Sequence, residues 1–144
     1  MTINQLSLFL ENKPGHLRQA VRTLAEAGVN ILTLNLADTQ QFGILRLIVR
    51  DWQKAKDALE KAGFVVNLTA VVAAEVADRP GGLADMLDVV AQAGANIEYM
   101  YAFTLRKGDK AVMVIRFDNP EAAVEALRAH GQSIVSSVEL YERA

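Results

Sequence analysis

Two short loops contain the residues best suited to binding chemistry. The first is Asn12-Lys13-Pro14-Gly15-His16-Leu17 and the second is Asp78-Arg79-Pro80-Gly81-Gly82-Leu83. In each loop a polar residue precedes Pro-Gly, and apolar residues at helical spacing follow. Such a loop presents free backbone N–H groups at the start of a helix, where the positive end of the helix dipole attracts a carboxylate. The same pattern also fits an ordinary strand-to-helix turn that binds no ligand.

The two loops belong to an internal repeat. Pro14 and Pro80 are 66 positions apart, and the same offset relates Gly15 to Gly81, Leu17 to Leu83, Gly28 to Gly94, Asn30 to Asn96 and Ile31 to Ile97. A hairpin loop that is two residues longer in the second copy changes the offset to 68, as for Gly63 and Gly131. The repeat predicts two modules, which we place at residues 1–69 and 70–144.

Apolar periodicity predicts the same order of elements in both modules. In the first module we expect strands at residues 3–10, 30–37 and 44–50 and from residue 64, with helices at 14–27 and from Asp51 to Gly63. In the second module we expect strands at 71–77, 96–105, 111–117 and 133–141, with helices at 80–93 and 120–129. This β-α-β-β-α-β order predicts an α+β protein of two tandem ferredoxin-like modules, each an antiparallel sheet with its helices on one face.

Residues 65–77, where the modules join, contain neither glycine nor proline. A flexible linker is therefore not expected, and one strand should run straight into the next. We expect the two modules to be fixed rigidly to each other, and a shared or exchanged strand is one way to achieve this.

Several predicted strands are apolar on both faces, as in the stretches 31–36 and 99–103. A sheet that carries helices on one side needs only one apolar face. The second face predicts cover by the other module, by a second chain, or by both. We expect both and hence a homodimer, with an exposed apolar patch of ordinary size as the alternative.

The composition is that of an ordinary globular protein, with 144 residues, 51% hydrophobic and 22% charged. The net charge of −2, without a clustered basic patch, argues against a nucleic-acid partner. The chain has no apolar run of membrane-spanning length and no signal pattern at its N-terminus, so we expect no membrane partner and a cytoplasmic location.

Residues for catalysis and metal binding are scarce. The absence of cysteine excludes disulfides, thiolate metal sites and a cysteine nucleophile. His16 and His130 are not at metal-ligand spacing with any carboxylate. Motifs for a serine nucleophile, a phosphate loop or a dinucleotide are also missing. We expect no catalytic residues, no metal and no cofactor, and we assign Asp38 and Asp109 to hairpin turns.

The tandem element order, the Asn/Asp-x-Pro-Gly-x-Leu loops and the Gly-x-Asn-Ile segments resemble the ACT domain family over nearly the whole chain. ACT domains are small-molecule-sensing modules, often attached to enzymes of amino-acid metabolism. The chain looks like a stand-alone tandem ACT protein without a catalytic domain. The resemblance implies a non-enzymatic, allosteric regulatory protein whose ligand, an amino acid, lies at the interface of two paired modules.

The resemblance also implies which residues bind the ligand. Loop amides and an asparagine after the first strand hold it, with help from the asparagine that opens the second strand. The matching residues are Asn12, Lys13, Pro14, Gly15, His16, Leu17, Asn30 and Ile31 in the first module, and Asp78, Arg79, Pro80, Gly81, Gly82, Leu83, Asn96 and Ile97 in the second. An aspartate cannot donate to a carboxylate, so the two sites should differ. Leu10 stands where some members have histidine, which disfavours serine-type recognition and suits an apolar amino acid.

Two other functions fit the sequence. The chain can be a regulatory subunit that holds no ligand and binds a catalytic partner of amino-acid biosynthesis through its sheet face. It can also be a small enzyme, because acylphosphatase-like enzymes share the ferredoxin-like fold. Such an enzyme needs an arginine loop and a placed asparagine, for which Arg79 is the one candidate.

Overall fold

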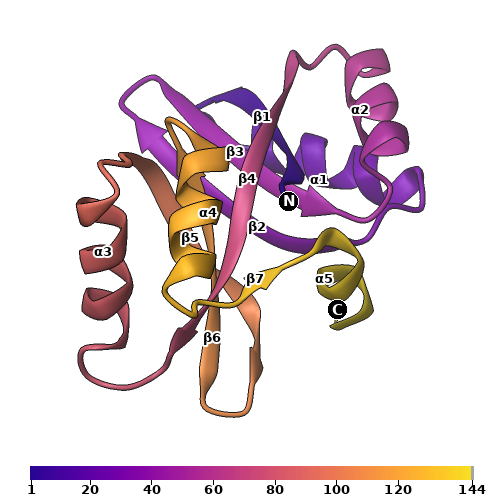
Figure 1. The fold of residues 1–144 in the computed structure, drawn as a ribbon. Coiled ribbons are helices and arrows are strands. Elements are labelled where there is room, and N and C mark those ends of the chain that lie inside the picture. Colours follow the sequence, from indigo (N-terminus) through magenta and orange to yellow (C-terminus); the bar gives the residue numbers. More distant parts are fainter. Residues whose placement is uncertain (144) are drawn as a thin grey trace. The chain divides into compact units, whose positions relative to one another are not determined.

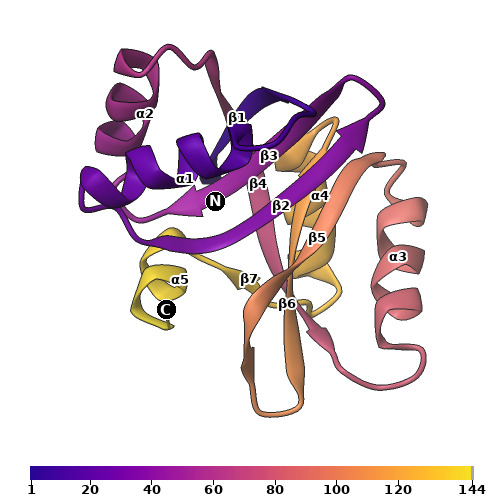
Figure 2. The same ribbon diagram turned by 180° about the vertical axis from the view of Figure 1, so that it is seen from behind.

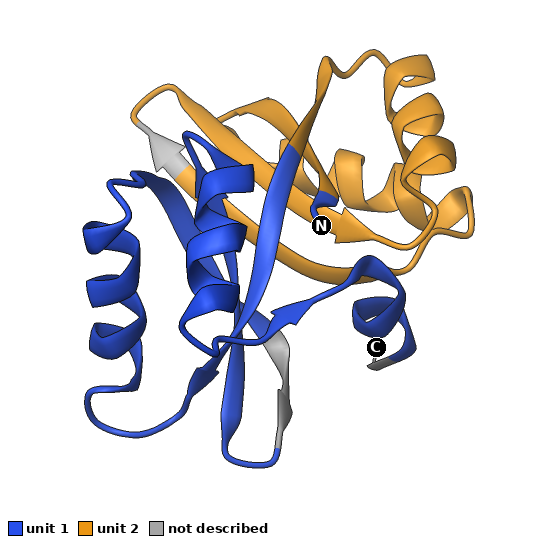
Figure 3. Cartoon of the chain, in the orientation of Figure 1, with its two compact units in different colours: residues 1–3, 70–144 blue, residues 4–69 orange. Residues whose placement is uncertain are grey.

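The computed structural model describes residues 1–143, except for the side chains of residues 38–39, 104–107 and 143. It divides into two compact units (Figure 3), which we call unit 2 (Asn4–Thr69) and unit 1 (Met1–Ile3 with Ala70–Ala144). Asp109 lies in a turn as predicted, whereas the side chain of Asp38 is outside the described residues. None of the described helices is long and apolar enough to cross a membrane.

Unit 2 has the predicted β-α-β-β-α-β order. Its elements are β1 (Ile3–Glu11), α1 (His16–Glu26), β2 (Ile31–Thr39), β3 (Phe42–Val49), α2 (Trp52–Lys61) and the first residues of β4 (Val66–Ala77). The strands are ordered β2-β3-β1-β4, and β3 pairs antiparallel with both β1 and β2. Both helices lie on one face of this sheet (Figures 1 and 2).

The core of unit 2 follows from the two hydrophobic periods. Alternate residues of the strands face the helices, and residues three or four apart on the helices face the strands. The fully buried members of this cluster are Leu6, Leu8, Leu45, Leu47 and Val49 from the strands, with Ala20, Leu24, Ala55 and Leu59 from the helices. Asp51 caps α2 as predicted, because its side chain accepts a hydrogen bond from the Lys54 N–H at 3.2 Å.

Unit 1 repeats this arrangement. After the remainder of β4 it contains α3 (Gly82–Gln92), β5 (Ile97–Lys107), β6 (Lys110–Phe117), α4 (Pro120–Ala129), β7 (Ile134–Val135) and α5 (Ser137–Arg143). β4 pairs antiparallel with β6 and with β7, and β6 pairs with β5. Its helix-side core includes Val72, Ala74, Met86, Val90, Ile115, Phe117, Val124 and Leu127. The predicted fold class is therefore confirmed.

The strand registers align the two copies residue by residue. Leu10 on β1 lies opposite Gly43 on β3, and Val76 on β4 lies opposite Ala111 on β6. Gly43 therefore corresponds to Ala111, which is the offset of 68 that the sequence predicts after the longer hairpin loop. This correspondence makes a direct comparison of the two loops possible.

The strand predicted at residues 133–141 is wrong. Only Ile134–Val135 form a strand, and a helix, α5, follows from Ser137. The Ser136 side chain accepts a hydrogen bond from the Glu139 N–H at 3.2 Å, and the Ser136 carbonyl accepts one from the Leu140 N–H at 2.9 Å. Ser136 thus acts as a helix cap with a glutamate three residues later, and the helix buries Leu140 completely.

The join between the modules is one strand. β4 runs without interruption for 12 residues, from Val66 to Ala77, and residues 69 and 70 lie within it. The structure thus has the strand-to-strand passage that the sequence predicts. The rigid fixing of the two modules and the sharing or exchange of a strand stay predictions.

Candidate functional site

The loop between β1 and α1, residues 12–15, brings the first group of predicted residues together. Gly15 precedes the helix with φ of +87°, a left-handed conformation that favours glycine. The Lys13 N–H donates to the Glu11 carbonyl at 2.8 Å, which closes the turn. Among the described residues, no acceptor is bound by the N–H groups of Gly15 and Leu17 at the start of α1. These groups are available to an anion, as the sequence predicts.

Asn12 forms hydrogen bonds that connect this loop to the turn between β2 and β3. Its backbone N–H donates to the Gln41 carbonyl at 2.9 Å, and its side-chain Nδ2 donates to the Gln40 carbonyl at 3.0 Å. The second hydrogen on Nδ2 and the side-chain oxygen remain for a ligand. Asn12 therefore has a structural role, and the ligand-binding role predicted for it stays a prediction.

His16 also stabilises this loop, through one hydrogen bond and one ring contact. Its Nδ1 accepts a hydrogen bond from the Glu11 N–H at 2.6 Å. Its ring also stacks on Phe64, with 5.5 Å between the ring centres and 27° between the planes. These two contacts explain His16 as a residue that positions the loop, whether or not a carboxylate is bound.

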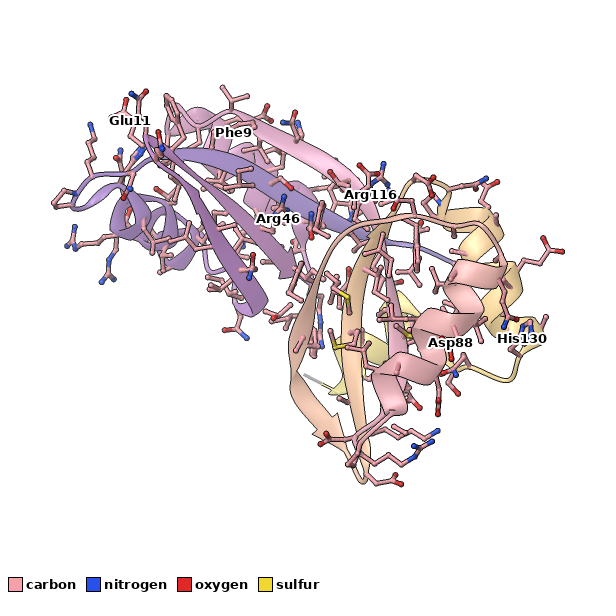
Figure 4. The ribbon with its side chains drawn as sticks, turned by 90° about the vertical axis from the view of Figure 1, so that its left-hand side faces the viewer. Phe9, Glu11, Arg46, Asp88, Arg116 and His130 are labelled. Carbon is pink, nitrogen blue, oxygen red and sulfur yellow. The ribbon has the colours of Figure 1, made fainter. Side chains whose placement is uncertain are left out.

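Glu11 and Lys13 place opposite charges side by side at the loop. Lys13 Nζ lies 2.7 Å from Glu11 Oε2, and both side chains are exposed. The hydrogen bond and the charge of Lys13, and the nearby His16, lower the pKa of Glu11 from its ordinary value of 4.5. Glu11 is therefore an anion at neutral pH, and Figure 4 shows it at the end of β1 near Phe9.

A cavity of about 170 Å³ lies against this loop. Its lining combines polar residues, Glu11, Asn12 and Lys13, with apolar ones, Leu10, Leu17, Leu36 and Gly43. A single water needs only about 10–15 Å³ by a comparable measure, so the cavity has room for a small organic molecule. Its mixed lining suits a molecule that is charged at one end and apolar at the other.

The equivalent loop of unit 1 has the same backbone hydrogen bonds but different side-chain chemistry. The Asp78 N–H donates to the Asp109 carbonyl at 2.8 Å, as Asn12 does to Gln41. The Arg79 guanidinium contacts the Asp85 carboxylate and the Pro80 carbonyl, both at 3.0 Å. The Arg79 side chain is thus already bound to groups of its own loop and of α3. Ala77 replaces Glu11, so this loop lacks the paired opposite charges beside the strand end.

Gly82, which corresponds to His16, packs directly against the end of β4. A Cβ atom built on Gly82 would lie 1.9 Å from the Ala77 carbonyl oxygen. The Gly82 N–H also donates to the Arg79 carbonyl at 3.0 Å, whereas the corresponding distance from His16 to Lys13 is 3.4 Å. The second loop is therefore the tighter of the two, and it has no space for a side chain at this position.

Comparison with known proteins identifies the fold of both units. The model of the ACT domain pair matches residues 1–143 of this chain. The chain belongs to the ACT domain pair family.

Solved structures agree with this membership. A crystallised protein from Bacteroides thetaiotaomicron is 39% identical, covers 99% of this chain and 97% of its own, and has a TM-score of 0.91. The regulatory subunit of aspartate kinase from Thermus thermophilus is 24% identical, with 89% and 92% coverage and a TM-score of 0.64. Its counterpart from Thermus flavus is 24% identical, with 88% and 90% coverage and a TM-score of 0.61. The last two show a shared fold. No functionally curated protein matches the sequence.

ACT modules are regulatory, and the structure brings together only part of the predicted ACT ligand set. Asn30 is exposed at the start of β2, while Leu36 at the cavity is six residues further along that strand, roughly 20 Å away. Ile31 and Ile97 pack against the helix-side cores. The Asn96 N–H donates to the Asp118 carboxylate at 3.0 Å. Asn30 and Asn96 therefore lie away from the loop of their own unit.

Four cavity residues of this ACT module, Leu10, Glu11, Leu36 and Gly43, were not among the predicted site residues, although Leu10 was noted as suiting an apolar amino acid. Glu11 lies between the strand predicted at residues 3–10 and the predicted loop, and it belonged to neither. Leu36 and Gly43 reach the loop only through the pairing of β1, β3 and β2, and the register places Gly43 opposite Leu10. A prediction of the strand register in the β2–β3 hairpin and its pairing with β1 would have placed Leu36 and Gly43 beside the loop. The described side chains form no group of acidic residues and histidines that could hold a metal ion.

Proposed function

We propose that this ACT protein is a cytoplasmic, non-enzymatic regulator that binds a free amino acid in the cavity beside the loop after β1. The observation that supports this proposal is the cavity of about 170 Å³, which joins an anion, a cation and free amides to an apolar wall. A zwitterionic α-amino acid carries the complementary set of groups.

Each part of the ligand has a proposed contact. The carboxylate binds the N–H groups of Gly15 and Leu17 and the ammonium group of Lys13, because a helix start favours negative charge. The ligand ammonium group binds the Glu11 carboxylate and the Asn12 side-chain oxygen. The protein then replaces the Glu11–Lys13 pair by two pairs with the ligand, and no charge is left without a partner.

We propose that the second loop binds no ligand, so that one chain takes up one amino acid. Asp78 would repel a carboxylate, and Arg79 is already paired with Asp85. Gly82 leaves no space between α3 and the end of β4. Residues 78–83, which the sequence analysis assigned to ligand binding, contribute in this proposal only to the fold of their module.

A second copy of the chain completes the regulatory mechanism in this proposal. β2 ends the strand order of unit 2, and its Leu34 and Leu36 are each 45% exposed. An open strand edge with apolar side chains favours association. Asn30 would then contact a ligand from a partnering module. By linkage, the ligand changes the packing of the chains only as far as its affinity differs between the two arrangements.

A thermal-shift screen of the full-length protein against the twenty amino acids tests the proposal, followed by calorimetry on those that raise the melting temperature. A ligand at 100 times its dissociation constant stabilises the protein by about 2.7 kcal/mol, which for this size means a rise of roughly 5–10 °C. The Asn12→Ala variant should lose at least ten-fold in affinity, and the matched Asp78→Ala variant should bind like the wild type with one ligand per chain. The proposal fails if no amino acid binds or if both variants bind normally.

Exposed aromatic residues favour a second function, that of an interaction subunit without a ligand. Phe9 is 54% exposed and Phe42 is 47% exposed on the sheet face opposite the helices of unit 2. Aromatic residues are enriched at protein interfaces. If no amino acid binds, this function is tested by co-purification with a biosynthetic enzyme and by loss of that complex in a Phe9→Ser, Phe42→Ser double variant.

A further inference from the structure

The apolar end of the cavity indicates which side chain the ligand has. This inference rests on the amino-acid binding proposed above. We propose that this end accepts an unbranched or branched aliphatic side chain, and that Gly43 with Leu36 sets the length that fits. Gly43 is thus inferred to be a specificity-determining residue. The inference depends on the lining of the cavity and on the space around Gly43.

Among the side chains that the structure describes, those that line this end are apolar. They belong to Leu10, Leu17 and Leu36, and the backbone of Gly43 completes the lining. A ligand hydroxyl, amide or carboxylate that entered here would lose its water without gaining a partner, whereas an aliphatic chain would bury apolar surface. The cavity should therefore discriminate against serine and aspartate and favour valine, leucine or methionine.

Gly43 limits the depth of the cavity. It is buried in β3, with Leu10 of β1 as its pairing partner on one side. A Cβ atom on Gly43 would lie 3.2 Å from Leu36 Cδ1 and 3.6 Å from the Ala37 carbonyl oxygen. The contact with Leu36 is closer than ordinary packing allows. Because Leu36 is half exposed, its side chain can move, and the space it would move into includes the cavity that it lines.

Calorimetry on the full-length protein with alanine, valine, leucine, methionine and serine tests this inference. The wild type should bind valine, leucine or methionine at least ten-fold more tightly than serine. The Gly43→Ala variant should lose about ten-fold or more for leucine and methionine and less than three-fold for alanine. The matched Ala111→Gly variant should leave every affinity unchanged.

A second variant covers the case in which Gly43→Ala perturbs the fold. Leu36→Ala enlarges the same end of the cavity and should shift the preference from valine towards methionine. The inference is overturned if serine binds as well as leucine, or if both variants change the affinities for all five amino acids by the same factor. The underlying site is tested separately, because Asn12→Ala should weaken all five equally.

Discussion

Substitution of Gly82 by alanine is the sharpest test of the packing at the second loop. The new Cβ would lie 1.9 Å from the Ala77 carbonyl oxygen and 2.9 Å from its carbon, and both of these are backbone atoms. Ordinary contact begins at 3.4 Å, so the start of α3 must move away from β4 by about 1.5 Å. The movement would also strain the hydrogen bond from the Gly82 N–H to the Arg79 carbonyl, now 3.0 Å.

The magnitude follows from the cost of overpacking. Backbone shifts forced by an added methyl group typically cost about 1–3 kcal/mol. For a chain of this size each kcal/mol lowers the melting temperature by roughly 2–4 °C. Gly82→Ala should therefore lower the melting temperature by about 2–12 °C, as measured by circular dichroism or calorimetry.

Gly94→Ala is the matched control, because it adds the same methyl group at the other end of the same helix. Gly94 has φ of +70°, and among the described residues nothing lies within 4 Å of its added Cβ. Only the left-handed backbone is strained, at about 1–2 kcal/mol. The argument is refuted if Gly82→Ala melts no lower than Gly94→Ala. Because the cavity belongs to the first loop, amino-acid affinity at the remaining folded fraction should not change.

Two further predictions concern the first loop. His16→Ala removes the acceptor of the Glu11 N–H and the ring stacked on Phe64, so the free energy of unfolding should fall by about 1–2 kcal/mol in urea denaturation; an unchanged midpoint would show that these contacts do not stabilise the protein. Glu11 has a lowered pKa, so its negative charge is present above the ordinary value of 4.5 and is lost only as pH falls through the lower folded value. The Glu11 carboxylate should therefore support amino-acid binding at neutral pH, and affinity should decline only as the pH falls below the ordinary value of 4.5. Glu11→Gln should bind more weakly and lack that decline; a variant with the wild-type pH profile would contradict a role for Glu11.

The order of elements could be predicted because local signals determine it. Alternating leucines mark β1, helical spacing marks α1, and the Asp51 cap marks the start of α2. The prediction of a strand at residues 133–141 was wrong because the repeat suggested a fourth strand in the second module. The apolar residues after Val135 were therefore assigned to that strand. The capping signal of Ser136 with Glu139 was present in the sequence and outweighs that pattern in the structure.

The candidate site could be predicted only where it is local. The loop after β1 is a contiguous stretch, and its turn geometry follows from Pro-Gly. Leu36 and Gly43 join it through strand pairing, which depends on the register of a hairpin and not on spacing along the chain. Asn30 was grouped with Asn12 by family resemblance, but the length of β2 separates them within one module.

The uninterrupted strand β4 makes it difficult to divide the protein into two separately folded halves. Residues 69 and 70 are adjacent within a 12-residue strand that pairs with β6 from Val72 onward. Truncation there would leave a strand stub at the end of one fragment and at the beginning of the other. Such stubs expose unpaired N–H and C=O groups and promote aggregation. Half-length proteins are therefore poor stand-ins for either module, and the ligand-binding function is better dissected by point substitutions in the intact chain.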